Sequence, residues 1–373
     1  MNRISKKKVF ITLITFIFII FAVNELDSRI EQLNDLQSRV DRIENKLGGT
    51  DTLDCDKNQI IKDVSKSIVR VVGAYSEGSG VIIDNKGTII TNYHVVNGEP
   101  SPKIVFSDYS KITAEYVAVD KDVDLALLKI DTETPNYIDL SQKKLYLLYT
   151  LQPLDTVYSF GFPLGTDIAG DVTVQEGHFA SLRTDAGVDY IHTDLSLQGG
   201  QSGGALTDVC GNLIGINQLT LSGASFSISN YTVYEFLESS MEKENPLEDV
   251  TTISFLEDES ALEAVRAFYN YQVVHQLEKA YQLLSDDFLD GISYEDWIKG
   301  YADVVGIELI SIEETDQENV VEFKMESIDL VYQDRVSKYF EGTWEVENKD
   351  GLWELNKPSI KQVEDPSWDW FYE

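Results

Sequence analysis

Residues 192–206 read HTDLSLQGGQSGGAL, and they place the hydroxyl of Ser202 between two pairs of glycines. Glycine lets backbone N–H groups take up conformations that other residues avoid. An acyl-transfer site needs this freedom, because two N–H groups must point at one developing oxyanion. The stretch therefore predicts Ser202 as a nucleophile within an oxyanion loop of Gly200, Gln201 and Ser202, in which Gly200 and Ser202 donate their N–H groups. Alone, the motif leaves open a Gly/Ser-rich turn without chemistry.

Two upstream stretches supply the groups that such a nucleophile needs. An apolar, β-branched run is followed by TNYHVV, residues 91–96, which predicts a hairpin that delivers His94 at the end of a strand. Residues 122–130 read DVDLALLKI and place Asp124 just before a buried strand. A serine hydroxyl is a poor nucleophile unless a base takes its proton, and the base needs a third group to orient it. His94, Asp124 and Ser202 supply these three roles in chain order.

These residues resemble the HtrA/Deg branch of the trypsin-like serine proteases. The resemblance covers about half of the chain, and its pieces follow the family's order at residues 78–83, 91–96, 124–129, 160–165, 193–194, 200–204 and 215–217. It implies a serine endopeptidase that needs no cofactor, with His94 as the base, Asp124 as the orienting group and Ser202 as the nucleophile.

The loop before the serine departs from the family. The family usually has Asn-Pro-Gly-Asn there, whereas this chain has Gln198-Gly199-Gly200-Gln201. Loss of the proline makes the loop more flexible. We therefore expect the substrate or a neighbouring segment to order the loop.

The resemblance also implies an all-β, two-barrel trypsin-like domain over residues 55–241. The first barrel carries His94 and Asp124 in this prediction. The second runs from about residue 145 to residue 230 and carries Ser202. Catalysis is expected between the two barrels.

Leu197, Phe226 and Ile228 are the predicted substrate pocket. Phe226 and Ile228 match the strand that walls the specificity pocket in the family, and Leu197 lies shortly before the nucleophile. The pocket is expected to be apolar and modest in size, without an acidic residue to bind a basic side chain. The alternative is that Leu197 and Ile228 are ordinary core residues.

The chain has two cysteines, Cys55 and Cys210. An exported protein permits a disulfide, and a bridge between these two would tie the start of the protease-like region to the second barrel. No His or Cys spacing predicts a metal site.

The N-terminus predicts a membrane anchor and a stalk. Residues 1–8 are a basic tail, and residues 9–23 are almost wholly apolar. This run is shorter than the roughly 20 residues of a typical span, but no small-residue cleavage site follows, which favours an uncleaved transmembrane anchor over a signal peptide. The basic flank places the N-terminus in the cytoplasm and the protease domain outside the cell. Heptad spacing over residues 24–49 predicts a coiled coil and a homo-oligomer, and a single amphipathic helix is the alternative.

An acidic linker at residues 242–257 precedes a C-terminal part in which helices come before strands. Helices are expected at residues 260–277, 277–284 and 294–301, and strands at 304–314, 319–331, 336–348 and 351–360. This order over residues 258–362 resembles the α+β NTF2-like cone and not the PDZ domain that the family normally places there. Its aromatic residues either line a ligand pocket or fill the core. Residues 363–373 form an acidic, aromatic tail.

The chain is strongly acidic, with 64 acidic and 30 basic residues and a net charge of −34. Such a surface repels phosphate backbones, which excludes nucleic acid as a partner. The predicted function is a membrane-anchored serine endopeptidase that cleaves exported or misfolded proteins or peptides outside the cell. Two alternatives stay open: a catalytically silent sensor or holdase that binds unfolded segments, and a stalk protein whose C-terminal part does the work.

Overall fold

The computed structural model describes residues 55–140, 150–163, 171–221, 224–240, 250, 253, 255–332 and 334–371. Apart from Cys55, the described residues belong to one compact unit, Asp56–Glu373. The predicted anchor (9–23) and coiled coil (24–49) lie outside the described residues, as does most of the predicted linker. In the part that is described, no helix is both long enough and apolar enough to cross a membrane.

The first half of the protease-like region is a seven-stranded antiparallel sheet. Helix α2 (Lys57–Ser65) precedes it, and Asp56 caps this helix by accepting from the N–H groups of Asn58 and Gln59. The strand order is β5-β4-β1-β2-β3-β7-β6. The strands are β1 (Ile68–Val72), β2 (Glu77–Ile82), β3 (Thr88–Thr91), β4 (Lys103–Val105), β5 (Lys111–Thr113), β6 (Glu115–Asp120) and β7 (Leu125–Lys129).

This sheet occupies the place of the predicted first barrel, and its strand pairing does not run all the way round. Its edge strands β5 and β6 do not pair with each other. A single residue, Ala114, connects them, so the sheet must roll up to bring its two edges together. The N–H of Ala114 donates to the carbonyl of Pro102 and not across the seam.

The second half closes into a barrel with the strand order β10-β13-β12-β11-β8-β9. Its strands are β8 (Thr156–Gly161), β9 (Thr173–Asp185), β10 (Val188–Thr193), β11 (Ala205–Thr207), β12 (Leu213–Leu221) and β13 (Ala224–Ser229). Helix α4 (Asn230–Ser240) follows directly, and its Val233 and Phe236 join the buried core with Phe160 and Ile216. Strand pairing around the full ring leaves no free edge.

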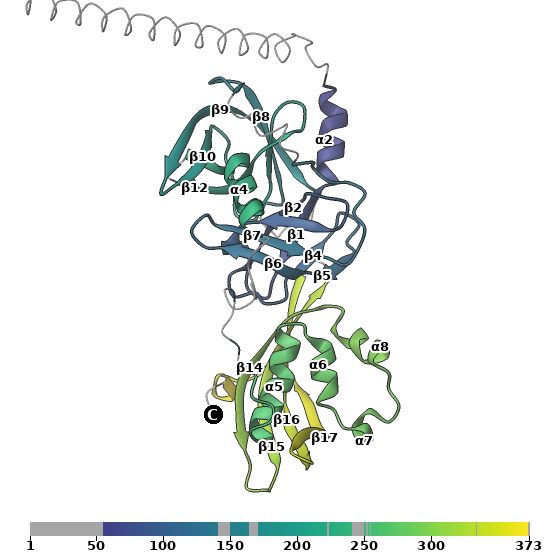
Figure 1. The fold of residues 1–373 in the computed structure, drawn as a ribbon. Helices are drawn as coiled ribbons and strands as arrows, with labels where there is room; N and C mark the ends of the chain where they lie inside the picture. Colours follow the sequence, from purple (N-terminus) through teal and green to yellow (C-terminus); the bar gives the residue numbers. More distant parts are fainter. Residues whose placement is uncertain are drawn as a thin grey trace, which may run out of the picture. The chain divides into compact units, whose positions relative to one another are not determined.

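The C-terminal part has helices first and strands afterwards, as predicted. Figure 1 shows α5 and α6 beside the four-stranded antiparallel sheet, whose order is β14-β15-β16-β17. The elements are α5 (Ala261–Val273), α6 (Leu277–Gln282), α7 (Asp286–Leu289), α8 (Tyr294–Trp297), a 3-10 turn (Ile298–Tyr301), β14 (Val304–Glu314), β15 (Val320–Val331), β16 (Asp334–Lys349) and β17 (Leu352–Val363). The NTF2-like identity of this part stays a prediction.

The aromatic residues of this part mainly fill its core. Phe268, Tyr269, Tyr271 and Trp344 are each at most 4% exposed and belong to one apolar cluster between α5 and the sheet. Trp344 stacks edge-on against Phe268, with 5.6 Å between the ring centroids. Its indole N–H donates to the Tyr269 hydroxyl at 3.0 Å, which satisfies the buried polar group.

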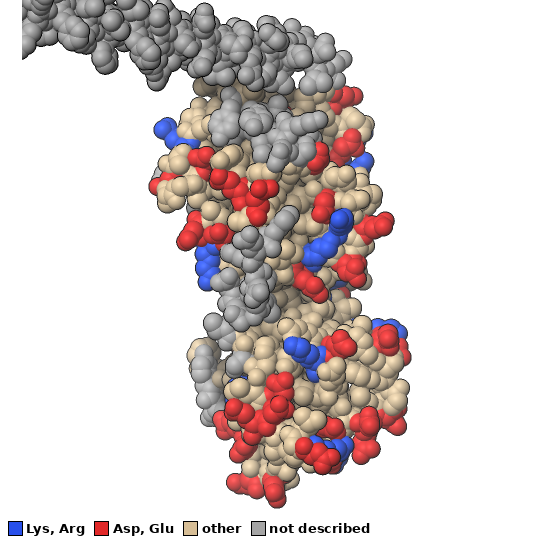
Figure 2. Space-filling model, viewed as in Figure 1, with Lys and Arg blue, Asp and Glu red and all other residues tan. Residues whose placement is uncertain are grey.

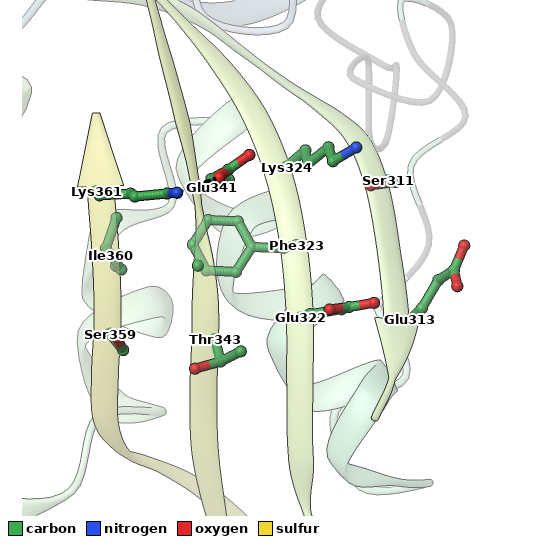
Figure 3. Close-up of a pocket in the computed structure, with 11 residues that line it drawn as sticks. Ser311, Glu313, Glu322, Phe323, Lys324, Glu341, Thr343, Ser359, Ile360 and Lys361 are labelled. Carbon is green, nitrogen blue, oxygen red and sulfur yellow. Dashed lines mark ion pairs between the residues drawn. The ribbon is translucent and has the colours of Figure 1, made fainter. Parts of the chain in front are cut away.

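The other face of the sheet carries a cavity of about 510 Å³, and part of the acidic tail contacts two of the residues that line it. Figure 3 shows Lys361 beside Glu341 on this face, and their charged atoms are 2.6 Å apart. Trp370, in the 3-10 turn Trp368–Phe371, donates its indole N–H to Glu341 and accepts from Lys324 through its carbonyl. Lys361 and Trp370 together lower the pKa of the Glu341 carboxyl.

The acidic side chains are spread over the face of the molecule drawn in Figure 2, with scattered basic ones between them. A surface of this kind repels polyanions at low ionic strength. Both cysteines, Cys55 and Cys210, are disulfide-bonded in the structure.

We expect Tyr269→Phe to lower the free energy of unfolding by about 1–3 kcal/mol, because it leaves the buried N–H of Trp344 without an acceptor. Urea unfolding followed by tryptophan fluorescence measures the change. Tyr332→Phe is the matched control, because Tyr332 is 86% exposed. An equal effect of the two substitutions would contradict the importance of this hydrogen bond.

Candidate active site

His94 lies in the one-turn helix α3 (Tyr93–Val96), directly after β3. Its backbone N–H donates to Asp124 Oδ1 at 2.9 Å, and its ring Nδ1 lies 2.8 Å from Asp124 Oδ2. The backbone carbonyl of Asp124 also accepts from the N–H of Tyr93 and from the side chain of Asn92. One residue therefore fixes both the helix and the imidazole that it carries.

Asp124 itself sits at a constrained backbone position just before β7. Its φ is +56°, in the left-handed region, which aspartate tolerates better than most residues. Its side chain is 17% exposed, whereas that of His94 is 48% exposed. The carboxylate is thus shielded while the imidazole faces solvent, which is the arrangement that a general base beside a substrate requires.

Gln218, on β12, joins this pair to Ser202. Its side-chain Nε2 donates to Asp124 Oδ2 at 3.0 Å, and its backbone carbonyl accepts from the Ser202 hydroxyl at 2.6 Å. Within the described parts of the chain, no hydrogen bond links Ser202 to His94 directly. The structure therefore brings the three predicted residues to one place, with the serine hydroxyl turned toward Gln218.

The loop that carries Ser202 is fixed by backbone pairing with β12. The N–H of Gly203 donates to the carbonyl of Asn217 at 2.9 Å, and the N–H of Asn217 donates to the carbonyl of Gly204 at 2.8 Å. The fully buried side chain of Asn217 bonds Ser159 and two backbone carbonyls. Gly203 has φ +83°, and a Cβ there would lie 2.0 Å from the carbonyl oxygen of Ser79. Only glycine fits this close approach.

The oxyanion loop holds two free backbone donors. Gly200 has φ +87°, and in the described structure neither its N–H nor that of Ser202 has a hydrogen-bond partner. The N–H of Gln201 differs, because it donates to the carbonyl of Gln198 at 3.1 Å. Gln201 therefore contributes a buried side chain to the loop and no donor, which leaves Gly200 and Ser202 as the pair that can face an oxyanion.

Ser79, on β2, is a residue that the sequence did not single out. It is fully buried, and its hydroxyl donates to the carbonyl of Gly200 at 2.8 Å and accepts from the N–H of Phe162 at 2.9 Å. Its own N–H donates to the carbonyl of Ser202 at 2.8 Å. Ser79 thus holds the loop by the carbonyls on both sides of Gln201, and it directs the Gly200 carbonyl away from the site.

The three residues of the predicted substrate pocket have different surroundings. Ile228 is fully buried in the barrel core, and Leu197 is 9% exposed. Phe226 is half-buried, and its ring stacks on that of His192 with 5.2 Å between centroids. Their role in substrate recognition stays a prediction.

A second histidine–carboxylate pair lies on the barrel. The N–H of His178 donates to Asp194 Oδ1 at 2.6 Å, and its ring Nδ1 lies 2.9 Å from Asp194 Oδ2, as in the His94 pair. Hydrogen bonds from His178 lower the pKa of the Asp194 carboxyl. Both side chains are about half exposed, and they lack the shielding of Asp124. Elsewhere too, the described residues hold no group of three or more His, Cys, Asp or Glu that could bind a metal ion.

Comparison with known proteins agrees with this geometry. Residues 78–216, which include His94, Asp124 and Ser202, match the model of the trypsin-like peptidase domain. The predicted resemblance is confirmed. Over 191 residues the chain is 34% identical to the serine protease Do-like HtrA of Lactobacillus helveticus, covering 48% of this chain and 44% of the relative. It is 31% identical over 232 residues to the serine protease Do-like HtrA of Bacillus subtilis, covering 57% and 50%.

A third relative is the probable periplasmic serine endoprotease DegP-like of Pseudomonas savastanoi, 35% identical over 156 residues, which cover 41% of this chain and 32% of the relative. The chain thus spans half or less of the length of these relatives. Together the findings support the predicted class, a serine endopeptidase of the HtrA/Deg type.

We expect Ser79→Ala to lower kcat on a peptide substrate roughly tenfold, because small displacements of an oxyanion donor are costly. The substitution removes the hydroxyl that donates to the Gly200 carbonyl and accepts from the Phe162 N–H. Ser110→Ala is the control, because its exposed hydroxyl bonds only the nearby Asp108. Wild-type kcat in Ser79→Ala, measured on protein with an unchanged melting temperature, would contradict the role of this serine.

Proposed function

We propose that this chain is a membrane-anchored, extracytoplasmic serine endopeptidase that hydrolyses peptide bonds in exported or misfolded proteins. The observation that carries the proposal is the placement of Ser202 against Gln218, whose side chain binds the same Asp124 carboxylate that orients His94. A nucleophile, a base and an orienting carboxylate are thereby held on one hydrogen-bonded frame.

In the proposed mechanism, the Ser202 hydroxyl first turns from the Gln218 carbonyl toward His94. Rotation about one side-chain bond is a fast motion, and catalytic hydrogen bonds are often formed only when substrate is bound. Ser202 Oγ then attacks the peptide carbonyl while His94 takes its proton. The N–H groups of Gly200 and Ser202 donate to the oxyanion that develops.

The intermediate then collapses to an acyl-enzyme. Protonated His94 passes its proton to the leaving amine, and the Asp124 carboxylate stabilises the imidazolium until that transfer is complete. Water then attacks the acyl carbonyl while His94 takes its proton, and His94 returns this proton to Ser202 Oγ as the acyl–oxygen bond breaks and the product acid leaves. Every proton in this cycle moves through His94.

A second candidate function is a silent sensor or holdase that binds unfolded segments. The observation that favours it is the Ser202 hydroxyl, which is bonded to Gln218 and not to His94. The two functions differ in one measurable respect, the reactivity of Ser202.

We expect Ser202→Ala to abolish cleavage of a casein-type substrate, with a loss of at least about 10⁴-fold, and to abolish labelling by a serine-directed phosphonate. Ser196→Ala is the matched control, since Ser196 is an exposed serine of the same loop region. An unlabelled wild-type chain that still binds unfolded protein would favour the holdase instead.

Anchoring and self-association are also proposed. The basic and apolar N-terminal stretches and the heptads after them support both, and the name of the Pseudomonas savastanoi relative, a periplasmic endoprotease, supports an extracytoplasmic location.

We expect protease to remove the large domain when it is added to cells whose outer layers are permeable and whose cytoplasmic membrane is intact. A cytoplasmic marker protein should stay uncleaved. Because residues 9–23 are expected to remain in the membrane, the full chain should sediment with membranes before this treatment. Recovery of the chain with a new N-terminus near residue 24, or resistance of the domain to external protease, would refute the proposed topology.

A further inference from the structure

The turn between β1 and β2 is held from outside by Arg335, which lies on β16 of the C-terminal part. Arg335 Nε donates to the carbonyl of Gly73 at 3.0 Å, and Nη2 donates to the carbonyl of Ser76 at 2.7 Å. Nη2 also lies 3.3 Å from the Glu77 carboxylate. One planar guanidinium therefore spans both ends of a four-residue turn, which a lysine ammonium cannot do with the same geometry.

The same turn is held from inside by Glu99. The Glu99 carboxylate is 3% exposed and accepts from the N–H groups of Ala74, Tyr75 and Ser76 at 2.6 to 2.7 Å. Burial raises the pKa of this carboxyl, and the three N–H donors oppose that rise. A Cβ at Gly73 would lie 2.2 Å from the carboxyl carbon of Glu99, so the turn can close on the carboxylate only with glycine at this position.

This clamped turn and the strand that follows it together contact both halves of the active site. The hydroxyl of Ser76 donates to the carbonyl of Val95, the residue after His94. Strand β2 begins at the end of the turn, and Gly78 packs so closely against Val95 and Ser202 that a Cβ there would lie within 2.9 Å of both. The next residue, Ser79, bonds the oxyanion loop as described above.

Further contacts accompany the guanidinium. The hydroxyl of Tyr75 donates to Glu308 on β14, and Lys111 on β5 pairs with Asp303. Around them, six buried side chains form one apolar cluster drawn from β1, the turn after it, β4, β14 and β15: Val72, Ala74, Val105, Val305, Ile328 and Leu330. The turn is therefore packed and hydrogen-bonded on the side of the C-terminal part.

We propose that Arg335 is a positioning residue for the active site, acting through the 73–76 turn on the helix of His94 and on the loop of Ser202. The inference rests on the proposed endopeptidase function. It assigns to the C-terminal part a mechanical role in catalysis, because the arginine that clamps the turn belongs to that part.

The test compares Arg335→Ala with Lys338→Ala in the full chain. Lys338 lies on the same strand, but its ammonium pairs with Asp329 within the C-terminal part. We expect Arg335→Ala to lower kcat and the rate of phosphonate labelling about tenfold, as misplacement of catalytic groups does, with KM changed by less than about twofold. Lys338→Ala should leave all three unchanged. Equal values of kcat for the two variants would overturn the proposal.

Arg335→Lys guards against simple unfolding, because it keeps the charge and most of the side chain. We expect it to melt at the wild-type temperature and to keep the kcat defect, since it lacks the planar fork. Wild-type kcat in this variant would overturn the role of the guanidinium.

Amide hydrogen exchange separates this inference from the proposed function. In Arg335→Ala, peptides that contain residues 74–76 and 94–96 should exchange faster than in Lys338→Ala, whether or not the chain cleaves substrate. A wild-type chain that resists phosphonate refutes the endopeptidase, while unchanged exchange at these residues refutes the clamp.

Discussion

The shielded carboxylate of Asp124 makes the contacts on which the site depends. It accepts from the backbone N–H of His94, lies against the ring nitrogen of His94 and accepts from the side chain of Gln218. The first two contacts stay within the seven-stranded sheet, and the third crosses to the closed barrel. Removing this carboxylate would leave three donors without their acceptor in a shielded place, which is costlier than losing a surface ion pair. Its left-handed backbone is the strained feature that this set of bonds maintains.

Ser202, the proposed nucleophile, is positioned by backbone contacts more than by side chains. The N–H of Gly203 donates to the carbonyl of Asn217 on β12, the N–H of Asn217 donates to the carbonyl of Gly204, and Ser79 holds the carbonyls of Gly200 and Ser202. Such bonds fix the direction in which the free N–H groups point, so the site is arranged before substrate arrives. What remains to move is the Ser202 hydroxyl. The sequence before the serine lacks the proline that the family usually has there. The backbone bonds nevertheless hold the loop at its two ends.

The sequence could predict the candidate catalytic residues but not the residues that hold them in place. His94, Asp124 and Ser202 carry recognisable local patterns, and strand β14 occupies the predicted range, because alternating and β-branched runs are local signals. Gln218 bonds Asp124, which is 94 residues away in the sequence, and Ser79 bonds Gly200, which is 121 residues away. No local pattern encodes such pairings. Helix α7 was not predicted because, at four residues, it is too short to show a helical period. The open seam at Ala114 likewise depends on pairing between strands and not on composition.

Arg335 lies in a strongly acidic part of the chain. From residue 241 onward there are 33 acidic and 10 basic residues, so a cation there has many carboxylates within reach. Besides its pairing with Glu77, Arg335 directs two of its N–H groups at uncharged carbonyls of a turn. A surface ion pair would be weak and loosely oriented, whereas a guanidinium on two carbonyls fixes distance and direction together. The Glu99 carboxylate lies on the other side of the same turn. The cation therefore binds carbonyl groups of this short segment, while the anion binds its N–H groups. That segment leads directly into the strand that touches both the helix of His94 and Ser202, so we expect a displacement of the turn to displace the proposed catalytic groups as well.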